Sequence, residues 1–228
     1  MITFAQYGED AILEGVIERL EWVTGDEFQK KTYIDIGGFH PEIHSIFYHF
    51  YKERGWRGSV YEPNTIHNGD FFRIRPFDNL HNYAVAGSAG FRKFLIFSDG
   101  DSSNTINQNF ASRKEKAQGT SVTSQKDVVC ITLKDAIRLH EQAFGETALV
   151  ISIDAEGSDF EIIANYDFTT RPLFFFIEDE PGQCGRQTPL NEQMLWHGYR
   201  PVAATVMTTL FMDTQTPYFE ALGKMGQR

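Results

Sequence analysis

The sequence predicts an α/β fold with one mainly parallel sheet. Apolar runs typical of buried strands alternate with segments of helical periodicity, and the first strand–helix–strand passage takes roughly 30 residues, the size of a βαβ unit. The segment 199–213 is long enough for two further antiparallel strands. The chain has 228 residues and no linker, so we expect a single domain spanning 1–228.

The first elements are predicted from periodicity and from residues that end helices and strands. A helix is expected over 9–22, where apolar residues recur at helical spacing. A strand follows in "KTYIDIGG" and ends at the glycines. A second helix over 45–54 is closed by Gly55, and the strand in "GWRGSVYEPN" ends at Glu62 before Pro63.

The later elements are less regular. Strands are expected at 82–86, 91–97, 148–154 and up to Glu178, and helices at 131–144, 158–166 and 190–197. The segment 98–127 is polar and aperiodic. A loop of that length is either a lid over a site or a flexible insertion, and the sequence leaves both interpretations open.

Composition excludes several classes of protein. The net charge of −10 disfavours a nucleic-acid partner held through its phosphates. Two cysteines do not make a secreted disulfide scaffold, so we expect a cytoplasmic location. The first residues lack the pattern of a signal peptide, and no run approaches about 18 apolar residues, so no membrane span is expected.

Acidic residues follow four of the predicted strands. In open α/β sheets, ligands bind outside the carboxyl ends of the strands. The strand ends read Asp35-Ile-Gly37-Gly38, Glu62-Pro-Asn64, Asp154-Ala-Glu156-Gly and Glu178-Asp179. Each acid has the alternative role of a solvated or helix-capping residue. Together they predict a ligand site at this edge of the sheet.

The ligand predicted from these residues is a cationic nucleoside. Neither glycine-rich phosphate-binding pattern is present, which disfavours an NAD-dependent oxidoreductase. A carboxylate two residues before the glycines repels pyrophosphate but attracts an ammonium or a sulfonium. Glu62 is placed to accept the ribose hydroxyls. S-adenosylmethionine has these features. A non-catalytic cofactor-binding protein on the same fold stays an alternative, as does the oxidoreductase.

Several motifs, in order, resemble a known family. "AQYGEDAILEG", "YIDIGGFHPEIHSIFYHFYKERGWRGSVYEPN", "NYAVAG" and "ISIDAEGSDFEIIANYDF" are similar to FkbM-type S-adenosylmethionine-dependent methyltransferases, from Phe4 to about Asp213. The resemblance implies the class I methyltransferase fold: Rossmann-like and doubly wound, with a mainly parallel seven-stranded sheet and a reversed last strand. It also implies O-methylation of a carbohydrate or another small metabolite.

The resemblance also implies roles for individual residues. The cofactor-binding set is Asp35, Gly37, Gly38, Glu62, Asn64, Ala84 and Asp154. The first three correspond to the methionine and ribose end, and Glu62 to the ribose hydroxyls. Asn64 and Ala84 correspond to the adenosine. Asp154 faces either the methionine portion or the acceptor. This chain departs from the family at Gly38-Phe39, where smaller residues are usual, and we expect Phe39 to narrow the methyl-transfer end.

A hydroxyl acceptor loses a proton, so a general base is expected. His40, two residues after Gly38, is the first candidate. Its alternative role is to bond the backbone or cap the next helix. Asp154 and Glu156 are the other candidates. Gln6 and Tyr7 are interpreted as the edge of a lid over the cofactor.

A divalent cation is a further hypothesis. Asp154 on one strand end, with Glu178 or Asp179 on another, offers the oxygen ligands that Mg²⁺ prefers. Alternatively, these acids bond to backbone amides or pair with Arg171 and Arg186.

Overall fold

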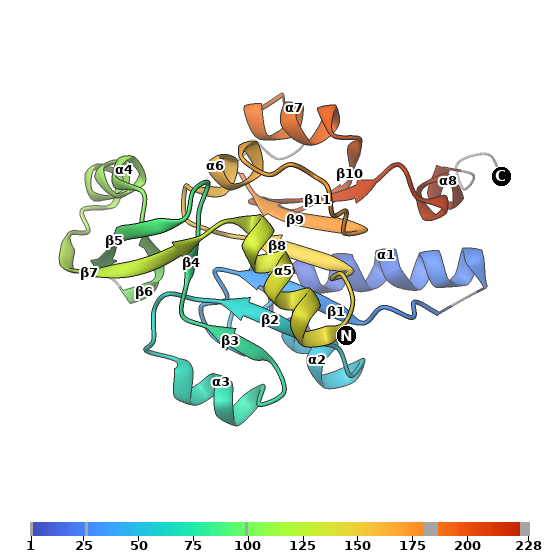
Figure 1. Ribbon diagram of the computed structural model, residues 1–228, viewed down its shortest axis with the longest axis horizontal. Coiled ribbons are helices and arrows are strands. Elements are labelled where there is room, and N and C mark those ends of the chain that lie inside the picture. Colours follow the sequence, from blue (N-terminus) through green and yellow to red (C-terminus); the bar gives the residue numbers. More distant parts are fainter. Residues whose placement is uncertain (1, 26, 99, 180–186, 224–228) are drawn as a thin grey trace.

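Two sheets and the helices around them make up the structure, a computed structural model that describes residues 2–25, 27–98, 100–179 and 187–223. Figure 1 shows the larger sheet at the centre of the molecule and the smaller sheet beside it, next to α4. Arg186, an alternative partner expected for the acids at the strand ends, lies outside the described residues.

The larger sheet has seven strands in the order β10-β11-β9-β8-β1-β2-β3. Their bounds are Thr32–Ile36 (β1), Arg57–Tyr61 (β2), Asn79–His81 (β3), Val150–Ile153 (β8), Phe174–Glu178 (β9), Tyr199–Ala204 (β10) and Thr208–Asp213 (β11). The last strand, β11, is antiparallel to both of its neighbours, whereas the pairs from β9 through β3 are parallel. The carboxyl ends of β1, β2, β8 and β9 therefore meet at one edge.

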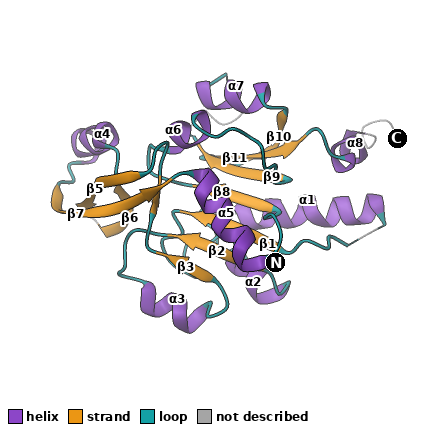
Figure 2. Ribbon diagram, in the orientation of Figure 1, coloured by secondary structure: helices purple, strands orange, loops and turns teal. Residues whose placement is uncertain are grey.

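Helices cover both faces of this sheet (Figure 2). The helices are α1 (Glu9–Thr24), α2 (Tyr48–Glu53), α3 (Asn68–Ile74), α4 (Gln108–Gln118), α5 (Leu133–Phe144), α6 (Asp159–Ala164), α7 (Pro189–Trp196) and α8 (Pro217–Gly223). Strand alternation in β1 separates two cores. Ile34 and Ile36 pack with α5, α6 and α7, whereas Tyr33 packs on the opposite face with α1 and α2.

The smaller sheet has the strand order β4-β7-β5-β6. Its strands are β4 (Ala84–Val85), β5 (Gly90–Phe97), β6 (Gly100–Thr105) and β7 (Val122–Ile131). The expectation that 98–127 is a loop was wrong, because this segment contains β6, α4 and part of β7. Asn107 caps α4 by accepting from the backbone N–H groups of Asn109 and Phe110. β6 has no apolar residue and is ordered by pairing with β5, which local periodicity does not reveal.

Other boundaries differ from the prediction. The helix expected over 45–54 covers only Tyr48–Glu53. The loop before it includes Phe39 and His44 in left-handed conformations. β3, α3 and α8 were not predicted. None of the described helices combines the length and apolar character needed to cross a lipid bilayer.

Candidate functional site

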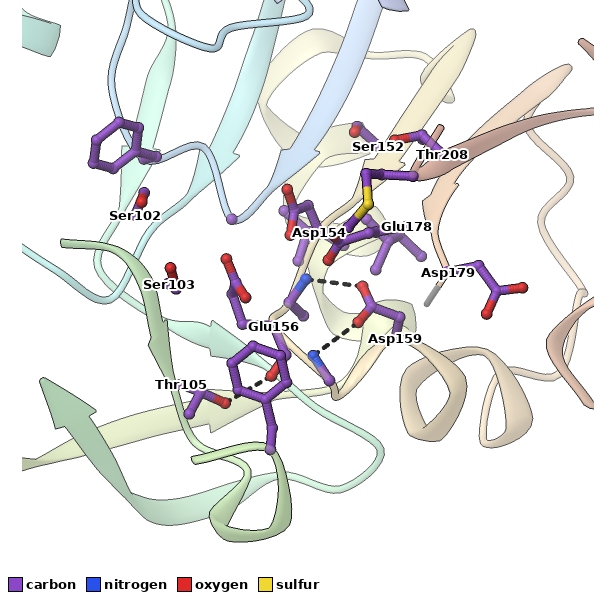
Figure 3. Close-up of a pocket in the computed structure, with 18 of the residues that line it drawn as sticks. Ser102, Ser103, Thr105, Ser152, Asp154, Glu156, Asp159, Glu178, Asp179 and Thr208 are labelled. Atoms are coloured by element: carbon purple, nitrogen blue, oxygen red, sulfur yellow. Dashed lines mark hydrogen bonds between the residues drawn. The ribbon is translucent and has the colours of Figure 1, made fainter. Parts of the chain in front are cut away.

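A cavity of about 930 Å³ lies at the carboxyl ends of β1, β2, β8 and β9. This is near the upper end of the range for small-molecule sites, which leaves room for a cofactor and an acceptor together. One wall comes from the large sheet and the opposite wall from β6 and α4 of the smaller sheet. Figure 3 shows polar side chains from both walls directed into the cavity.

The two glycines after β1 are required by close backbone packing. Gly37 has φ +80°, and a Cβ there would lie 1.8 Å from the carbonyl oxygen of Asp154. A Cβ on Gly38 would lie 2.3 Å from Val60 Cγ1. Gly37 lines the cavity and Gly38 does not. The glycines therefore let the loop pack against β8 and β2, in addition to exposing Gly37 to a ligand.

Glu62 is held in place by the backbone and lines the cavity. Its Oε2 accepts from the N–H of Phe39 (3.0 Å) and its Oε1 from the N–H of Asn64 (2.6 Å). A carboxylate has about four acceptor positions, so about two are left for a ligand. Burial raises the pKa of Glu62 to about 7, against the effect of these two hydrogen bonds. Ala84 also lines the cavity, whereas the Asn64 side chain does not.

Asp35 is not directed at the cavity. It lies 3.7 Å from Nη1 of Arg75, which is fully buried. Arg75 also donates to Asp78 (2.6 Å), to the Tyr33 hydroxyl (2.9 Å) and to Ser45 (3.2 Å). Burial raises the pKa of Asp35 to about 6, while Arg75 acts in the opposite direction. Asp35 thus belongs to a buried network beneath the glycine loop, and its predicted contact with a cationic ligand has no support in the structure.

The loop after β8 turns Glu156 into the cavity (Figure 3). Glu156 has φ +48°, a left-handed conformation that is uncommon outside glycine. Asp159 holds the loop by accepting from the N–H groups of Ala155 (2.8 Å) and Gly157 (3.2 Å). From the smaller sheet, Thr105 Oγ1 donates to the Glu156 carbonyl at 2.8 Å. Contacts from both sides of the cavity therefore support this conformation.

Asp154 and Glu178 form a pair of carboxyl groups that share a hydrogen bond. Asp154 is open to the cavity but surrounded by protein, and burial raises its pKa. Burial and the neighbouring Asp154 raise the pKa of Glu178 to about 12. Burial and the proximity of the two groups therefore favour retention of a proton by this pair. Burial similarly raises the pKa of Glu156 to about 9, with Asp154 adding to the shift.

Of the acids predicted to bind Mg²⁺, Asp154 and Glu178 form the pair described above, and Asp179 has a different partner. Asp179 accepts from the Thr188 hydroxyl at 2.9 Å. The expected alternative partner of these acids, Arg171, instead pairs with Asp213. Among the described residues, the one group of three metal-ligand side chains with atoms within 4.8 Å of one another lies elsewhere, at His40, His67 and Asp70.

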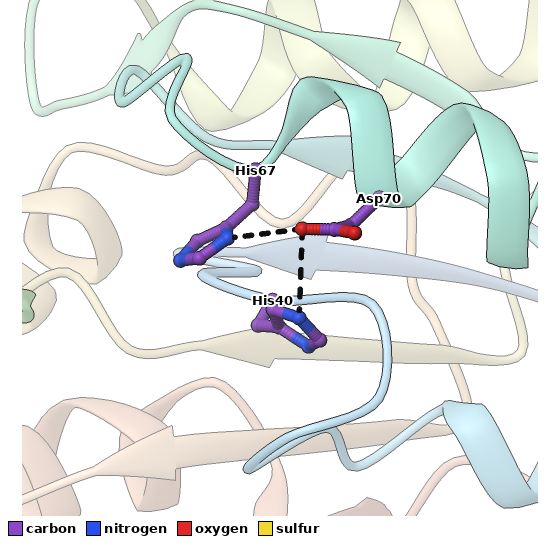
Figure 4. Close-up of side chains that lie close together, drawn as sticks. All are labelled: His40, His67 and Asp70. Atoms are coloured by element: carbon purple, nitrogen blue, oxygen red, sulfur yellow. Dashed lines mark hydrogen bonds and ion pairs between the residues drawn. The ribbon is translucent and has the colours of Figure 1, made fainter.

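His40 lies in that cluster, outside the cavity lining (Figure 4). Its Nδ1 accepts from the backbone N–H groups of Glu42 (3.1 Å) and Ile43 (3.0 Å). The proton of the neutral His40 ring is therefore on Nε2. This Nε2 lies 3.9 Å from Asp70 Oδ2, and His67 Nδ1 lies 3.4 Å from the same oxygen. A metal would need Nε2 without its proton. The backbone-bonding role is the one that the structure shows, and the base role of His40 has no support.

Sequence reasoning missed several residues of the cavity. Glu9 accepts from the hydroxyls of Thr205 (3.1 Å) and Thr208 (3.3 Å), and so joins α1 to the β10–β11 turn. An acid in the first turn of a helix is ordinary, so the sequence carried no signal of this contact. Ser152, a single serine inside an apolar strand, also lines the cavity. Gln6 and Tyr7 line it as well, and their role as a lid edge stays a prediction.

Comparison with known proteins gives one match. The model of the "Methyltransferase FkbM domain" family matches residues 35–201, which include both glycines, Glu62, Ala84, Asp154 and Glu178. No curated protein and no solved structure matches the chain.

Proposed function

The chain belongs to the FkbM methyltransferase family, and from this premise we propose that it methylates a hydroxyl group of a carbohydrate or another small metabolite, with S-adenosylmethionine as the methyl donor. The observation that carries the proposal is Glu62, fixed by two backbone hydrogen bonds at the end of β2 with acceptor positions left toward the cavity. The strand order and the reversed β11 support assignment to the class I methyltransferase fold.

The residues at the cavity fit this cofactor. Glu62 would accept the ribose hydroxyls, and the small side chain of Ala84 would lie beside the adenine. Gly37 leaves backbone exposed where the methionine portion would lie. The chain lacks the glycine-rich phosphate loops, which supports a nucleoside without phosphate over NAD.

S-adenosylmethionine, when bound, supplies an activated methyl group. The protein's part is to orient the acceptor hydroxyl and to take up its proton. We assign the base role to Glu156, because its left-handed conformation is held from both walls and its carboxyl group faces the cavity. Burial raises the pKa of Glu156, and the nearby Lys114 acts in the opposite direction. The positive charge of a bound sulfonium would favour the ionised form further, which is the form a general base needs.

Calorimetric titration tests the cofactor assignment. We expect S-adenosylmethionine and S-adenosylhomocysteine to bind and NAD⁺ to give no heat of binding. Tight binding of NAD⁺ alone would refute the assignment and favour an oxidoreductase.

Transfer of a labelled methyl group to a panel of sugars and small hydroxyl compounds tests the reaction. We expect product with the wild-type protein and a large loss of turnover in Glu156→Gln at unchanged S-adenosylhomocysteine affinity. Cofactor binding without transfer to any compound would favour the non-catalytic alternative.

A further inference from the structure

Two phenylalanine side chains line the cavity, one from each of its walls. Phe160 belongs to α6, on the side of the large sheet, and Phe110 belongs to α4, on the side of the smaller sheet. Phe160 lines the cavity and is nevertheless 48% exposed. Small-molecule sites are lined mainly by apolar and aromatic side chains, so both rings are candidates for contact with the acceptor.

Both phenylalanines are fixed relative to the loop that carries Glu156. A Cβ on Gly157 would lie 2.8 Å from Phe110 Cβ and 2.9 Å from Phe110 Cδ2, so the Phe110 side chain packs directly on this loop. Phe160 follows Asp159, whose carboxylate accepts from two backbone N–H groups of the same loop. Both rings therefore originate next to the general base that we assign.

Neither Phe110 nor Phe160 contacts an aromatic ring or a cation within the part of the chain that the structure describes. Phe160 is the more exposed of the two, and its ring therefore offers a surface on which a ligand can stack. Three other aromatic side chains of the cavity lining have such a contact, measured to the ring centroid: Phe39 with His67 (5.2 Å), Tyr61 with His81 (4.8 Å) and Phe94 with Lys126 (5.5 Å).

Hydroxyl side chains of β6 line the cavity as well. They belong to Ser102 and Ser103 (Figure 3). Ser103 lies two positions before Thr105, whose hydroxyl donates to the Glu156 carbonyl, so these two side chains share a face of β6. A serine hydroxyl both donates and accepts, which suits it to bind the hydroxyl groups of a ligand. The cavity around Glu156 therefore combines an aromatic surface with hydroxyl groups.

A pyranose ring matches this combination. It has a face composed mainly of C–H groups, and its hydroxyls project from the edge. The face of an aromatic ring is electron-rich and attracts the slightly positive hydrogens of C–H groups. An open-chain polyol has the same hydroxyls but no rigid apolar face, and it loses more conformational freedom on binding. The lining therefore favours a cyclic sugar over an open-chain one.

We propose that Phe160 is a specificity-determining residue for the acceptor, and that the acceptor is a pyranose whose C–H face lies against this ring. Phe110 bounds the acceptor site on the α4 side, and Ser102 and Ser103 bind hydroxyls at the edge of the sugar. The hydroxyl to be methylated then projects toward Glu156. This inference rests on the proposed function and narrows its acceptor class.

Binding to the full-length protein saturated with S-adenosylhomocysteine tests the inference without any need for turnover. The probes are the methyl pyranosides of glucose, galactose, mannose and rhamnose, each paired with the open-chain alditol of the same sugar. Calorimetry and ligand-observed NMR give the affinities. Saturation-transfer NMR shows which hydrogens of a bound pyranoside lie against the protein.

We expect at least one pyranoside to bind at least about tenfold more tightly than its alditol, with saturation reaching one face of the sugar more than the other. Phe160→Ala and Phe160→Leu should each lower the affinity for that pyranoside about tenfold, because leucine keeps an apolar side chain but has no ring face. Phe160→Trp should retain the affinity. Phe91→Ala is the matched control and should change nothing, since Phe91 is 77% exposed on β5 and lies outside the cavity lining.

Equal binding of pyranosides and alditols, or binding of neither, would overturn the inference and leave the cofactor assignment intact. So would wild-type affinity for the pyranoside in Phe160→Ala or in Phe160→Leu. Retained S-adenosylhomocysteine affinity shows that each variant is folded. Failure of the wild-type protein to bind S-adenosylhomocysteine would instead refute the proposed function itself, which keeps the two failures distinguishable.

Discussion

Replacing Glu62 with glutamine should separate cofactor binding from folding. The two carboxylate oxygens each accept one backbone N–H, from Phe39 and from Asn64. Whichever way the glutamine amide is oriented, its NH₂ group faces one of these N–H donors. One backbone hydrogen bond and part of the acceptor capacity toward the ribose are therefore lost.

The magnitudes predict a small change in stability. Losing a hydrogen bond to a charged group costs about 1.5–3 kcal/mol. Against this, the shift of the Glu62 pKa from 4.5 to about 7 means that the ionised side chain destabilises the fold by about 3 kcal/mol above pH 7. Glutamine removes that penalty. We therefore expect the free energy of unfolding at pH 8 to change by no more than about 1–2 kcal/mol.

Cofactor affinity should change much more. A lost hydrogen bond from a ribose hydroxyl to a charged group, about 1.5–3 kcal/mol, weakens S-adenosylhomocysteine binding at least about tenfold. Hydroxyl donors favour the ionised carboxylate, so the wild-type affinity should rise as pH increases through about 7 and then level off. In Glu62→Gln this contribution to the pH dependence should be absent.

The assay is calorimetric titration between pH 5.5 and 8.5, with urea unfolding as the measure of stability. Asp35→Asn is the matched control, because Asp35 contacts Arg75 and does not line the cavity. It should retain affinity better than Glu62→Gln does. Equal affinities for wild type and Glu62→Gln across this pH range would refute the assignment of Glu62 to the ribose.

Three further predictions concern the loops and the core. Gly37→Ala should prevent normal folding or abolish cofactor binding, since its Cβ would overlap the carbonyl oxygen of Asp154. Circular dichroism would detect the loss of folding, and calorimetric titration the loss of binding. A fully active variant would contradict the packing argument. Thr105→Val removes a hydrogen bond to the Glu156 backbone, worth about 1 kcal/mol, and should lower kcat at unchanged S-adenosylhomocysteine affinity. An unchanged kcat would contradict the role of Thr105 in positioning Glu156. Burial lowers the pKa of His140 from 6.5 to about 4, so its contribution to stability is present above pH 6.5 and is lost as pH falls toward 4, up to about 3 kcal/mol. Urea unfolding of wild type and His140→Gln at pH 7 and pH 4.5 measures this loss. An equal loss of stability in both proteins between the two pH values would contradict the prediction.

Side-chain periodicity and residue type along the chain were sufficient to predict six of the seven strands of the main sheet, all but β3. Strands and helices alternate as predicted, and the two strands at the end of the sheet, β10 and β11, are antiparallel. Glu62 and Asp154 could be placed at the cavity because a residue that follows a parallel strand must lie at the carboxyl edge of the sheet. That inference needs only local pattern and the direction of the strands.

Which partner each polar side chain has could not be predicted from the residues next to it in the sequence. Asp35 was expected at a strand end like Glu62, but it lies inside β1 in register with Val60 of β2. Arg75, 40 residues further on, pairs with it beneath the loop. His40 lies two residues after Gly38, but the turn of the backbone brings the N–H groups of Glu42 and Ile43 to its ring. No local pattern distinguishes these outcomes from a role in the site.

The sequence by itself determined six of the seven strands of the large sheet, the acids at its carboxyl edge and the family, because strand alternation and motif order are properties of short segments. The tertiary structure alone decided which acids face the cavity, that the segment 98–127 contributes a wall of it, and that Asp154 and Glu178 lie together as a pair of carboxyl groups. Those facts depend on burial and on which side chains meet, and both are set only when distant segments pack together.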